Sequence, residues 1–420
     1  MADFRTYRDR FLEAEIRQAL ADTRVVGLFG ARQTGKTTLA GHLSRRAASY
    51  VTFDDLTVQE TAKADPMAFA RALPRGSVID EVQRVPDILP AIKIIVDEDP
   101  RPGRFVLTGS ANLLTMPRLS ESLAGRMQVF TLFPFAQAEL ERSGRNFVDQ
   151  IFSGTFDVRH TVVGHTIKED FLQRIPRGGY PEVIARPQKR RNAWFESYVE
   201  TILRRDVREI AAIEDALAMH RLLRVAAARS AGMLNETALS SQIGLPRKTL
   251  SRYLGILERL YLVWRLPAYA RNRAHRAVKS PKLYLNDTGL AAYLLGADAV
   301  HLRRDRNLLG GLLETFVAAE LRAQASWSRN RPELYHYREH DGLEVDLLLE
   351  RHDGKVAAVV VKATSSPGAT DLSGLQRVAA EMGSALAAGV LLYGGNRALP
   401  FGKRLYALPI SALWSYLSVA

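Results

Sequence analysis

A glycine-rich run, GARQTGKTTL at residues 30–39, has the residue types and the spacing that phosphate binding needs. Gly30, Gly35, Lys36 and Thr37 satisfy the pattern G-x-x-x-x-G-K-[ST], in which backbone N–H groups turn inward around a phosphate. The run lies between an apolar stretch and a helical stretch, and the N-terminus of a helix favours an anion. These features predict an ATP site whose cradle consists of Gly30, Ala31, Arg32, Gln33, Thr34, Gly35, Lys36, Thr37 and Thr38.

An apolar stretch that ends in two acidic residues, GSVIDEVQ at residues 76–83, supplies the carboxylates for the same chemistry. In the glycine-rich loop, Lys36 reaches the β- and γ-phosphates and Thr37 offers its hydroxyl to Mg²⁺. At the end of the acidic stretch, Asp80 completes the Mg²⁺ shell and Glu81 polarises the attacking water as general base. The two segments together predict ATP hydrolysis with Mg²⁺. The alternative is an ordinary strand followed by an acidic turn.

A third apolar stretch, RFVLTGSAN at residues 104–112, ends in small polar residues. Ser110 and Asn112, with Thr108 behind them, are candidates to contact the γ-phosphate from a strand between the two segments described above. Turns favour the same residue types, so a plain turn at the end of a strand is the alternative.

Arg126 stands just before the next apolar run and is a candidate arginine finger. Such an arginine stabilises the charge that develops on the γ-phosphate and raises rates by roughly 10³–10⁵. If Arg126 acts on the nucleotide of a neighbouring subunit, the active form is an oligomer, a hexamer being one candidate. The alternative is an arginine that the dipole favours at the C-terminus of a helix.

The elements that position these residues follow an α/β pattern. Short β-rich runs alternate with helical stretches, which is typical of a parallel sheet covered by helices; the runs are Val25–Phe29, Val51–Phe53, Ser77–Ile79, Phe105–Thr108 and Gln128–Leu132. Beyond this region the pattern becomes mainly helical and then returns to mixed α/β. We therefore predict a P-loop ATPase domain at residues 1–140, a helical domain at 141–300 and a third, α/β domain at 301–420.

The net charge of +13 is concentrated in the middle of the chain, where residues 141–300 hold 26 Lys+Arg and 16 Asp+Glu. Basic charge gathered in one module favours a polyanionic partner such as DNA. The alternative is a well-solvated surface with no such partner.

The segment LNETALSSQIGLPRKTLSRYLGILERLYLVWRLPAY at residues 234–269 has the rhythm of a helix-turn-helix followed by a wing. Gly244 supplies the turn and Pro246 opens the second helix. Basic residues at the start of that helix and in the loop YARNRAHRAVK are candidate DNA contacts: Arg247, Lys248, Arg252, Arg271, Arg273 and Arg276. A winged helix used for protein docking is the alternative.

The C-terminal segment VDLLLERHDGKVAAVVVKAT at residues 345–364 predicts two strands and resembles the core of the PD-(D/E)XK nuclease fold. In that fold an Asp and a Glu-x-Lys hold a metal and a water beside a phosphodiester. Asp346 and Lys362 match, but Val360 stands at the Glu position and supplies no metal ligand. Glu314, on a preceding helix, could replace it. Otherwise Asp346 and Lys362 are expected to form an ion pair in a scaffold that does not cleave.

Taken together, these segments resemble the AAA+ superfamily, and more closely a bacterial and archaeal family that joins an AAA-type ATPase to a C-terminal domain of unknown function. The matching pieces are GARQTGKTTL, FDDL, VIDEVQRVPDILPAIK, VLTGSANLL, LAGR, RGGYPEV, RRDV, LYLNDTGLAAYL, LLETFVAAEL and EVDLLLE. The resemblance implies an ATPase that assembles with itself and works on DNA. Our first hypothesis is an oligomeric ATPase that couples ATP turnover to the binding or remodelling of DNA, such as branched or forked DNA in repair or recombination.

The composition of the chain limits the kinds of site and of partner that it can have. The chain has no cysteine, which excludes disulfides and thiolate metal sites and suits a reducing cytoplasm. No apolar run approaches the roughly 20 residues needed to span a bilayer, so a membrane partner is not expected. A nucleotide-dependent signalling switch or toxin–antitoxin component is the main alternative function, and an active ATP-dependent nuclease is a third.

Overall fold

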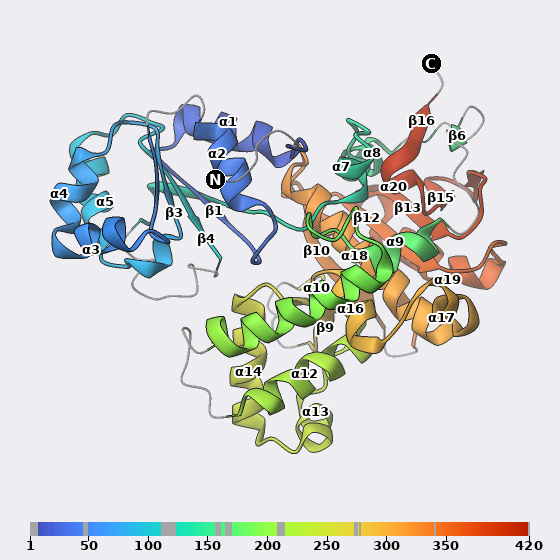
Figure 1. The fold of residues 1–420 in the computed structure, drawn as a ribbon. Coiled ribbons are helices and arrows are strands. Elements are labelled where there is room, and N and C mark those ends of the chain that lie inside the picture. The colour runs from blue at the N-terminus through green and yellow to red at the C-terminus, as the bar shows by residue number, and fades with distance from the viewer. Residues whose placement is uncertain are drawn as a thin grey trace. The chain divides into compact units, whose positions relative to one another are not determined.

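The computed structural model describes residues 7–44, 49–110, 123–154, 156, 161–163, 170–207, 215–272, 276, 279–339 and 342–418 (Figure 1). The chain divides into two compact units. Unit 1 comprises residues 1–135 and 259–261, and unit 2 comprises residues 136–258 and 262–420. The division into three domains at residues 140 and 300 stays a prediction.

Unit 1 contains a five-stranded sheet in which all neighbouring strands are parallel, in the order β2-β3-β4-β1-β5. All five β-rich runs predicted from the sequence form its strands, which confirms the parallel α/β fold; the strands are β1 (Val25–Phe29), β2 (Tyr50–Thr52), β3 (Ser77–Asp80), β4 (Phe105–Gly109) and β5 (Met127–Thr131). Strands β1, β3 and β4 are buried along their whole length, as their uninterrupted apolar sequences require in a sheet covered on both faces.

The helices of unit 1 connect these strands and cover the sheet. They are α1 (Leu12–Asp22), α2 (Lys36–Ser44), α3 (Leu56–Ala64), α4 (Pro66–Ala72) and α5 (Ile88–Glu98), with a short 3₁₀ turn at Val82–Arg84. Helix α5 buries an apolar stripe of six residues, which its sequence ILPAIKIIVDE places on one side. Figure 1 shows α3, α4 and α5 grouped apart from α1 and α2.

The first part of unit 2 is mainly helical. Its elements are α7 (Gln137–Leu140), α8 (Phe147–Ser153), β6 (Thr161–Val163), α9 (Phe171–Arg177), α10 (Gln188–Thr201), a π-turn at Ile202–Asp206, α12 (Ala216–Ala228), β7 (Gly232–Met233), α13 (Glu236–Ile243) and α14 (Arg247–Arg259). Gly244 joins α13 to α14 with a φ of +75°, a conformation that glycine adopts without strain. Asn235 caps α13 by accepting from the backbone N–H of Ala238.

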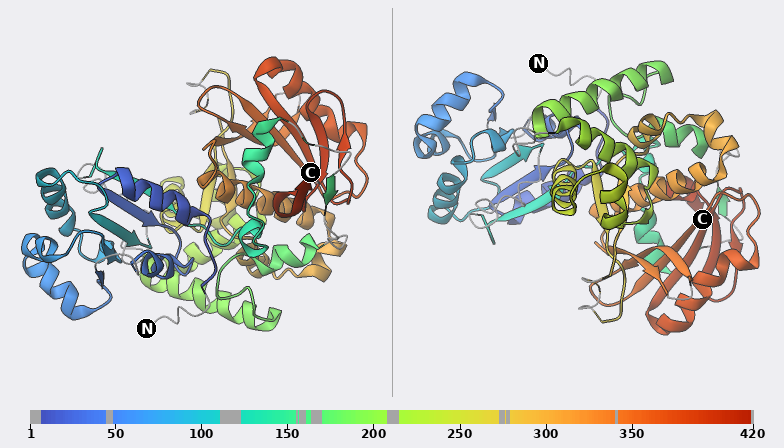
Figure 2. Two further views of the ribbon diagram at one scale, coloured as in Figure 1. Left: turned by 90° about the horizontal axis from the view of Figure 1, so that it is seen from above. Right: turned by 90° about the horizontal axis from the view of Figure 1, so that it is seen from below.

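Two sheets follow α14. Strands β8 (Val263–Leu266) and β9 (Lys282–Leu285) pair antiparallel, and β7 joins them in a three-stranded sheet. Helices α16 (Thr288–Leu295), α17 (Ala299–Arg304) and α18 (Arg306–Ser326) lead to a six-stranded sheet in the order β10-β11-β12-β13-β15-β14, which Figure 2 shows in orange and red. Its elements are β10 (Glu333–Arg338), β11 (Glu344–Glu350), β12 (Val356–Lys362), α19 (Ser373–Met382), β13 (Leu386–Tyr393), β14 (Leu399–Pro400) and β15 (Leu405–Pro409), before α20 (Ala412–Ser415) and β16 (Tyr416–Ser418).

Backbone hydrogen bonds connect the three-stranded sheet of unit 2 to its six-stranded sheet. The N–H of Tyr269, just after β8, donates to the carbonyl of His336 on β10, at 2.7 Å. The N–H of His336 donates in turn to the carbonyl of Pro267, at 2.9 Å. The segment that leaves β8 therefore lies along the free edge of β10, where Ala268 forms a parallel bridge with His336.

No helix in the ranges described has the length and the apolar composition that crossing a membrane requires.

Candidate active site

The glycine-rich loop of unit 1 runs from the end of β1 to the start of α2, as the sequence pattern predicted. Gly30, at a φ of +154°, passes so close to the residue that follows β5 that an added Cβ would lie 2.3 Å from the carbonyl oxygen of Leu132. Gln33 and Gly35 also have positive φ values, of +60° and +95°. These conformations curl the loop, and inward-curling backbone N–H groups form the concave surface that binds a phosphate.

An arginine that the sequence motifs did not point to fixes this loop. Arg10 is only 4% exposed; its Nη1 donates to the carbonyl of Thr34 at 2.9 Å, and its Nη2 donates to the carbonyl of Phe133 at 2.6 Å. Its guanidinium lies over the ring of Phe135, 4.2 Å from the centroid. Because both bonds are to backbone atoms, Arg10 holds the shape of the loop.

Lys36 is buried in the loop to which it belongs, at 5% exposed. Its Nζ donates to the carbonyl of Ala31 at 2.7 Å, across the turn of the loop. Thr34 Oγ1 donates to the same carbonyl at 3.0 Å. The ammonium group is thus kept at the cradle, where the charge of a bound triphosphate would lie.

The structure brings Thr37 and Asp80 together, as the predicted Mg²⁺ site requires. Thr37 Oγ1 donates to Asp80 Oδ2 at 3.2 Å, and Asp80 is 3% exposed. Thr108 on β4 donates to Asp80 Oδ1. Tyr50 on β2, which the sequence motifs did not indicate, donates to Asp80 Oδ2 at 2.7 Å. Burial raises the pKa of Tyr50 above its usual value, and the Asp80 carboxylate raises it further, so Tyr50 remains a donor.

These oxygens fit a magnesium ion. Mg²⁺ prefers hard oxygen ligands and takes one or two protein groups together with phosphate oxygens and waters. A hydroxyl and a carboxylate 3.2 Å apart beside the phosphate cradle are such a pair. Among the described residues, no group of three or more His, Cys, Asp or Glu side chains is arranged to hold a metal, so at this site the nucleotide would supply the remaining ligands.

Glu81 follows β3 in a left-handed conformation, with φ +55° and ψ +44°. This conformation is unusual for a residue other than glycine, and it turns the side chain toward the end of β4. There Ser110 Oγ donates to Glu81 Oε2 at 3.2 Å. The amide of Gln83, another residue that the motifs did not indicate, donates to the same carboxylate oxygen.

The room for Gln83 comes from Gly109, because an added Cβ there would lie 2.5 Å from Gln83 Oε1. Ser110, a predicted nucleotide contact, therefore contacts the predicted general base. Asn112 lies outside the described residues.

Arg126 forms an ion pair within its own chain. Its Nε and Nη2 donate to the two carboxylate oxygens of Asp97, near the end of α5, at 2.5 Å and 2.8 Å. Donation from Arg126 is the main cause that lowers the pKa of Asp97. The side chain of Arg126 is 29% exposed. Acting as a finger would therefore require Arg126 to leave Asp97.

The structure places the basic residues that were predicted to contact DNA in different environments. Arg247, Lys248 and Arg252 are exposed on α14. Arg271 is also exposed, and its guanidinium donates to the carbonyl of Glu381. Arg273 lies outside the described residues.

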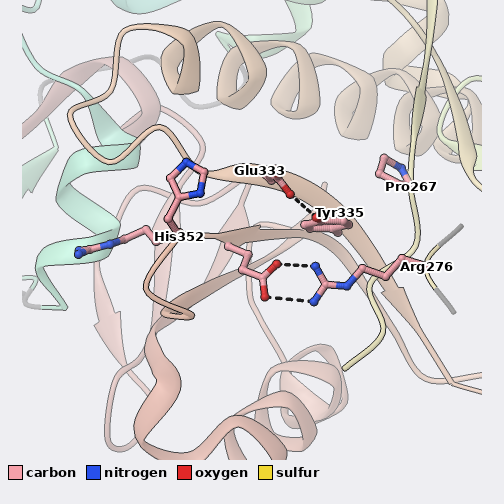
Figure 3. Close-up of a pocket in the computed structure, with 7 residues that line it drawn as sticks. Pro267, Arg276, Glu333, Tyr335 and His352 are labelled. Atoms are coloured by element: carbon pink, nitrogen blue, oxygen red, sulfur yellow. Dashed lines mark hydrogen bonds and ion pairs between the residues drawn. The ribbon is translucent and has the colours of Figure 1, made fainter. Parts of the chain in front are cut away.

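Arg276 is placed differently from an exposed DNA contact. Its side chain is 10% exposed and donates to both carboxylate oxygens of Glu350, at 2.5 Å and 3.1 Å. The pair lines a pocket of about 370 Å³ together with Tyr335 and His352. Figure 3 shows Arg276 beside Tyr335. The guanidinium also lies over the rings of Tyr269 and Tyr335. We therefore leave Arg276 out of the proposed DNA surface.

Comparison with known proteins places these features in a family. The sequence model of an AAA domain matches residues 22–141, and those of two domains of unknown function, DUF8612 and DUF4143, match residues 168–301 and 309–413. Among solved structures, the Walker-type ATPase PABY2304 of Pyrococcus abyssi is 15% identical, with a TM-score of 0.41 over 69% of this chain and 96% of that one. A T158V variant of RuvB from Thermotoga maritima is 20% identical, with a TM-score of 0.28 over 64% and 90%.

Two relatives match almost the whole chain. The uncharacterized proteins Rv2008c of Mycobacterium tuberculosis and Mb2031c of Mycobacterium bovis are each 31% identical to it over 409 residues, which make up 97% of this chain and 84% of each relative. The AAA domain coincides with the loop and the acidic strand end described above. The chain therefore belongs to the same family as these two proteins, and it is an AAA-type ATPase with the C-terminal domain of unknown function DUF4143.

Proposed function

We propose that this ATPase hydrolyses ATP with Mg²⁺ as an oligomer and couples turnover to the binding or remodelling of DNA. Bound ATP and Mg²⁺ supply the phosphoanhydride and the divalent charge that neutralises it. Within the chain, Lys36 holds the terminal phosphates, Thr37 and Asp80 hold the metal, and Glu81 takes the proton of the attacking water. Gln83 and Ser110 orient Glu81 until water and nucleotide are in place.

The exposed face of α14 is the observation that supports a DNA partner. The helix buries Leu250, Tyr253, Leu254 and Leu257 on one side and exposes Arg247, Lys248 and Arg252 on the other. None of these three basic side chains has an ion-pair partner among the described residues. Unpaired cations along one helix, beside a turn and an antiparallel strand pair, suit contact with phosphates in a groove.

The test measures the ATPase rate with no DNA, duplex, single strand and a four-way junction, each at low and moderate salt. A triple Arg247→Ala, Lys248→Ala, Arg252→Ala variant should lose the stimulation by DNA and keep the basal rate. Its matched control removes three exposed cations elsewhere in unit 2, Lys189, Arg190 and Arg306, and should keep the stimulation. For each phosphate contact that a substitution removes, the slope of log affinity against log salt should also fall by about 1.

A slow nucleotide-dependent switch is the second candidate function. Two interactions within one chain favour this candidate. Arg126 forms an ion pair with Asp97, and Glu81 accepts hydrogen bonds from Gln83 and Ser110. A protein held in this way would turn over slowly until a partner released both groups. A rate that stays the same with all four DNA conditions would support this candidate and contradict the first.

A further inference from the structure

A buried lysine of unit 2 lies among three carboxylates that come from two other elements. Lys282, on β9, has a side chain that is only 3% exposed. Its Nζ lies 2.8 Å from Glu314 Oε1 on α18 and 3.7 Å from Asp346 Oδ1 on β11, and it also pairs with Glu344 on β11. The charge of Lys282 is therefore directed into the protein and not toward solvent.

Other groups hold the carboxylates in place. Tyr284, next but one to Lys282 on the same strand, donates to Glu314 Oε1 at 2.6 Å. The backbone N–H of Val361 on β12 donates to Asp346 Oδ2 at 2.7 Å. Since α18, β9, β11 and β12 all contribute, the cluster is fixed by the fold and does not depend on one flexible loop.

The charges of the cluster do not balance. Three carboxylates face one ammonium group, and like charges confined in a buried space repel strongly. Burial, with repulsion from Asp346, raises the pKa of Glu314 to about 7. Burial alone would lower the pKa of Lys282, but the three carboxylates outweigh it and raise the pKa above its usual value, so the lysine stays charged.

The cluster contains Asp346 and Glu314, two residues that the sequence analysis considered as metal ligands of a nuclease-like scaffold. The elements around the cluster follow the order α18, β10, β11, β12, α19 and β13, with β13 parallel to β12. One detail differs from the sequence interpretation, because Asp346 forms its ion pair with Lys282, whereas the side chain of Lys362 is exposed. Glu314, which was suggested as a replacement ligand, lies in the same cluster as Asp346, because both carboxylates pair with Lys282.

We propose that Lys282 is a built-in cation that occupies the centre of this carboxylate cluster and excludes divalent metal ions from it. Converging carboxylate oxygens are what a hard divalent cation prefers. In the structure Lys282 Nζ lies between these oxygens, 2.8 Å from Glu314 Oε1 and 3.7 Å from Asp346 Oδ1, at the place that a metal ion would need. The C-terminal domain is then a metal-free scaffold, whatever partner the ATPase has.

The test counts bound Mn²⁺ in the full chain without nucleotide, from the decrease of the electron paramagnetic resonance signal of free Mn²⁺. An Asp80→Asn background removes the carboxylate ligand of the ATPase site. In that background, Lys282→Ala should bind one Mn²⁺ per chain at least ~10-fold more tightly than the parent, because removing the ammonium leaves three carboxylates unopposed. Adding Asp346→Asn should abolish the gain.

A folded Lys282→Ala variant that binds no more Mn²⁺ than its parent would overturn the proposal. So would a parent protein that already binds one Mn²⁺ and releases it on Asp346→Asn. If Lys282→Ala is not stable, Lys282→Met fills the same space with an uncharged chain. Mn²⁺ should then raise the midpoint of thermal unfolding of Lys282→Met and leave that of the parent unchanged, and equal shifts would refute the exclusion of metal.

Discussion

Glu320 gives unit 2 a stability that depends strongly on pH. This glutamate lies on α18, 4% exposed, where its Oε1 accepts from the backbone N–H of Gln137 at 2.6 Å. Its Oε2 is buried with no hydrogen-bond partner among the described residues. Burial, and to a lesser degree the neighbouring Glu139, raises the pKa of Glu320 to about 8, against a usual 4.5.

The sign and the size of the change in the free energy of unfolding with pH depend on whether the folded or the unfolded chain binds the proton of Glu320. Below about pH 4.5, Glu320 is protonated in both the folded and the unfolded chain, and its titration does not affect stability. Between pH 4.5 and 8 the unfolded chain loses the proton and the folded chain keeps it, so the free energy of unfolding falls by about 1.4 kcal/mol per pH unit. The decrease reaches about 3 kcal/mol at pH 7 and about 5 kcal/mol above pH 8.

Replacing Glu320 by glutamine removes this titration. Glu320→Gln should therefore be more stable than the parent by about 3 kcal/mol at pH 7, with an advantage that shrinks toward zero near pH 4.5. Urea unfolding followed by tryptophan fluorescence measures it, because all four tryptophans (Trp194, Trp264, Trp327 and Trp414) belong to unit 2.

Glu196→Gln, at an exposed position on α10, is the matched control and should change neither the stability nor its slope with pH. If the stabilities of Glu320→Gln and the parent run parallel from pH 5 to 8, Glu320 is ionised in the folded chain and the reasoning fails.

Three further outcomes are expected. Glu81→Gln should keep ATP binding and lose hydrolysis by ~10²–10⁴, as measured by phosphate release beside nucleotide affinity, since a general base contributes about that much; normal turnover would exclude Glu81 as the base. Arg126→Ala should lower turnover by ~10³ or more while Asp97→Asn, which weakens the restraint on Arg126, should not; equal effects would indicate that the ion pair is structural. Gly255→Ala changes a position in α14 where an added Cβ meets nothing within 4 Å. It should raise the free energy of unfolding by about 0.5–1 kcal/mol and weaken DNA binding if that face of α14 enters a groove. An unchanged DNA affinity would place the DNA on another surface.

The sequence predicted what local patterns determine. The five strands of unit 1 are short β-rich runs that alternate with helical stretches, so their existence and their parallel arrangement could be predicted from the sequence. The loop at Gly30–Thr37 was readable because its spacing carries a physical requirement. Thr37 and Asp80 were paired in advance because the loop and the strand end must meet at one edge of a parallel sheet.

Contacts between segments that lie far apart in the chain could not be predicted from the sequence. Tyr50, Gln83 and Arg10 reach the nucleotide site with no spacing that marks them. Arg276 was predicted from its basic loop to contact DNA, but its carboxylate partner lies 74 residues further along the chain. Lys282 carried no signal in the sequence, and its partner Glu314 lies 32 residues further along. A charge run shows how many cations a segment has, and only the fold shows which of them face inward.

Backbone hydrogen bonds join Tyr269 and Pro267 to His336. They connect the region that matches DUF8612, residues 168–301, to the region that matches DUF4143, residues 309–413. An exposed strand edge is a template for unwanted pairing, and here the segment after β8 covers the edge of β10. Cutting the chain between the regions, near residue 305, would uncover that edge and leave Lys282 without its carboxylates. A fragment that begins there should aggregate through this edge, whereas the intact chain can transmit a pull on β8 and β9 directly into the C-terminal sheet through its backbone.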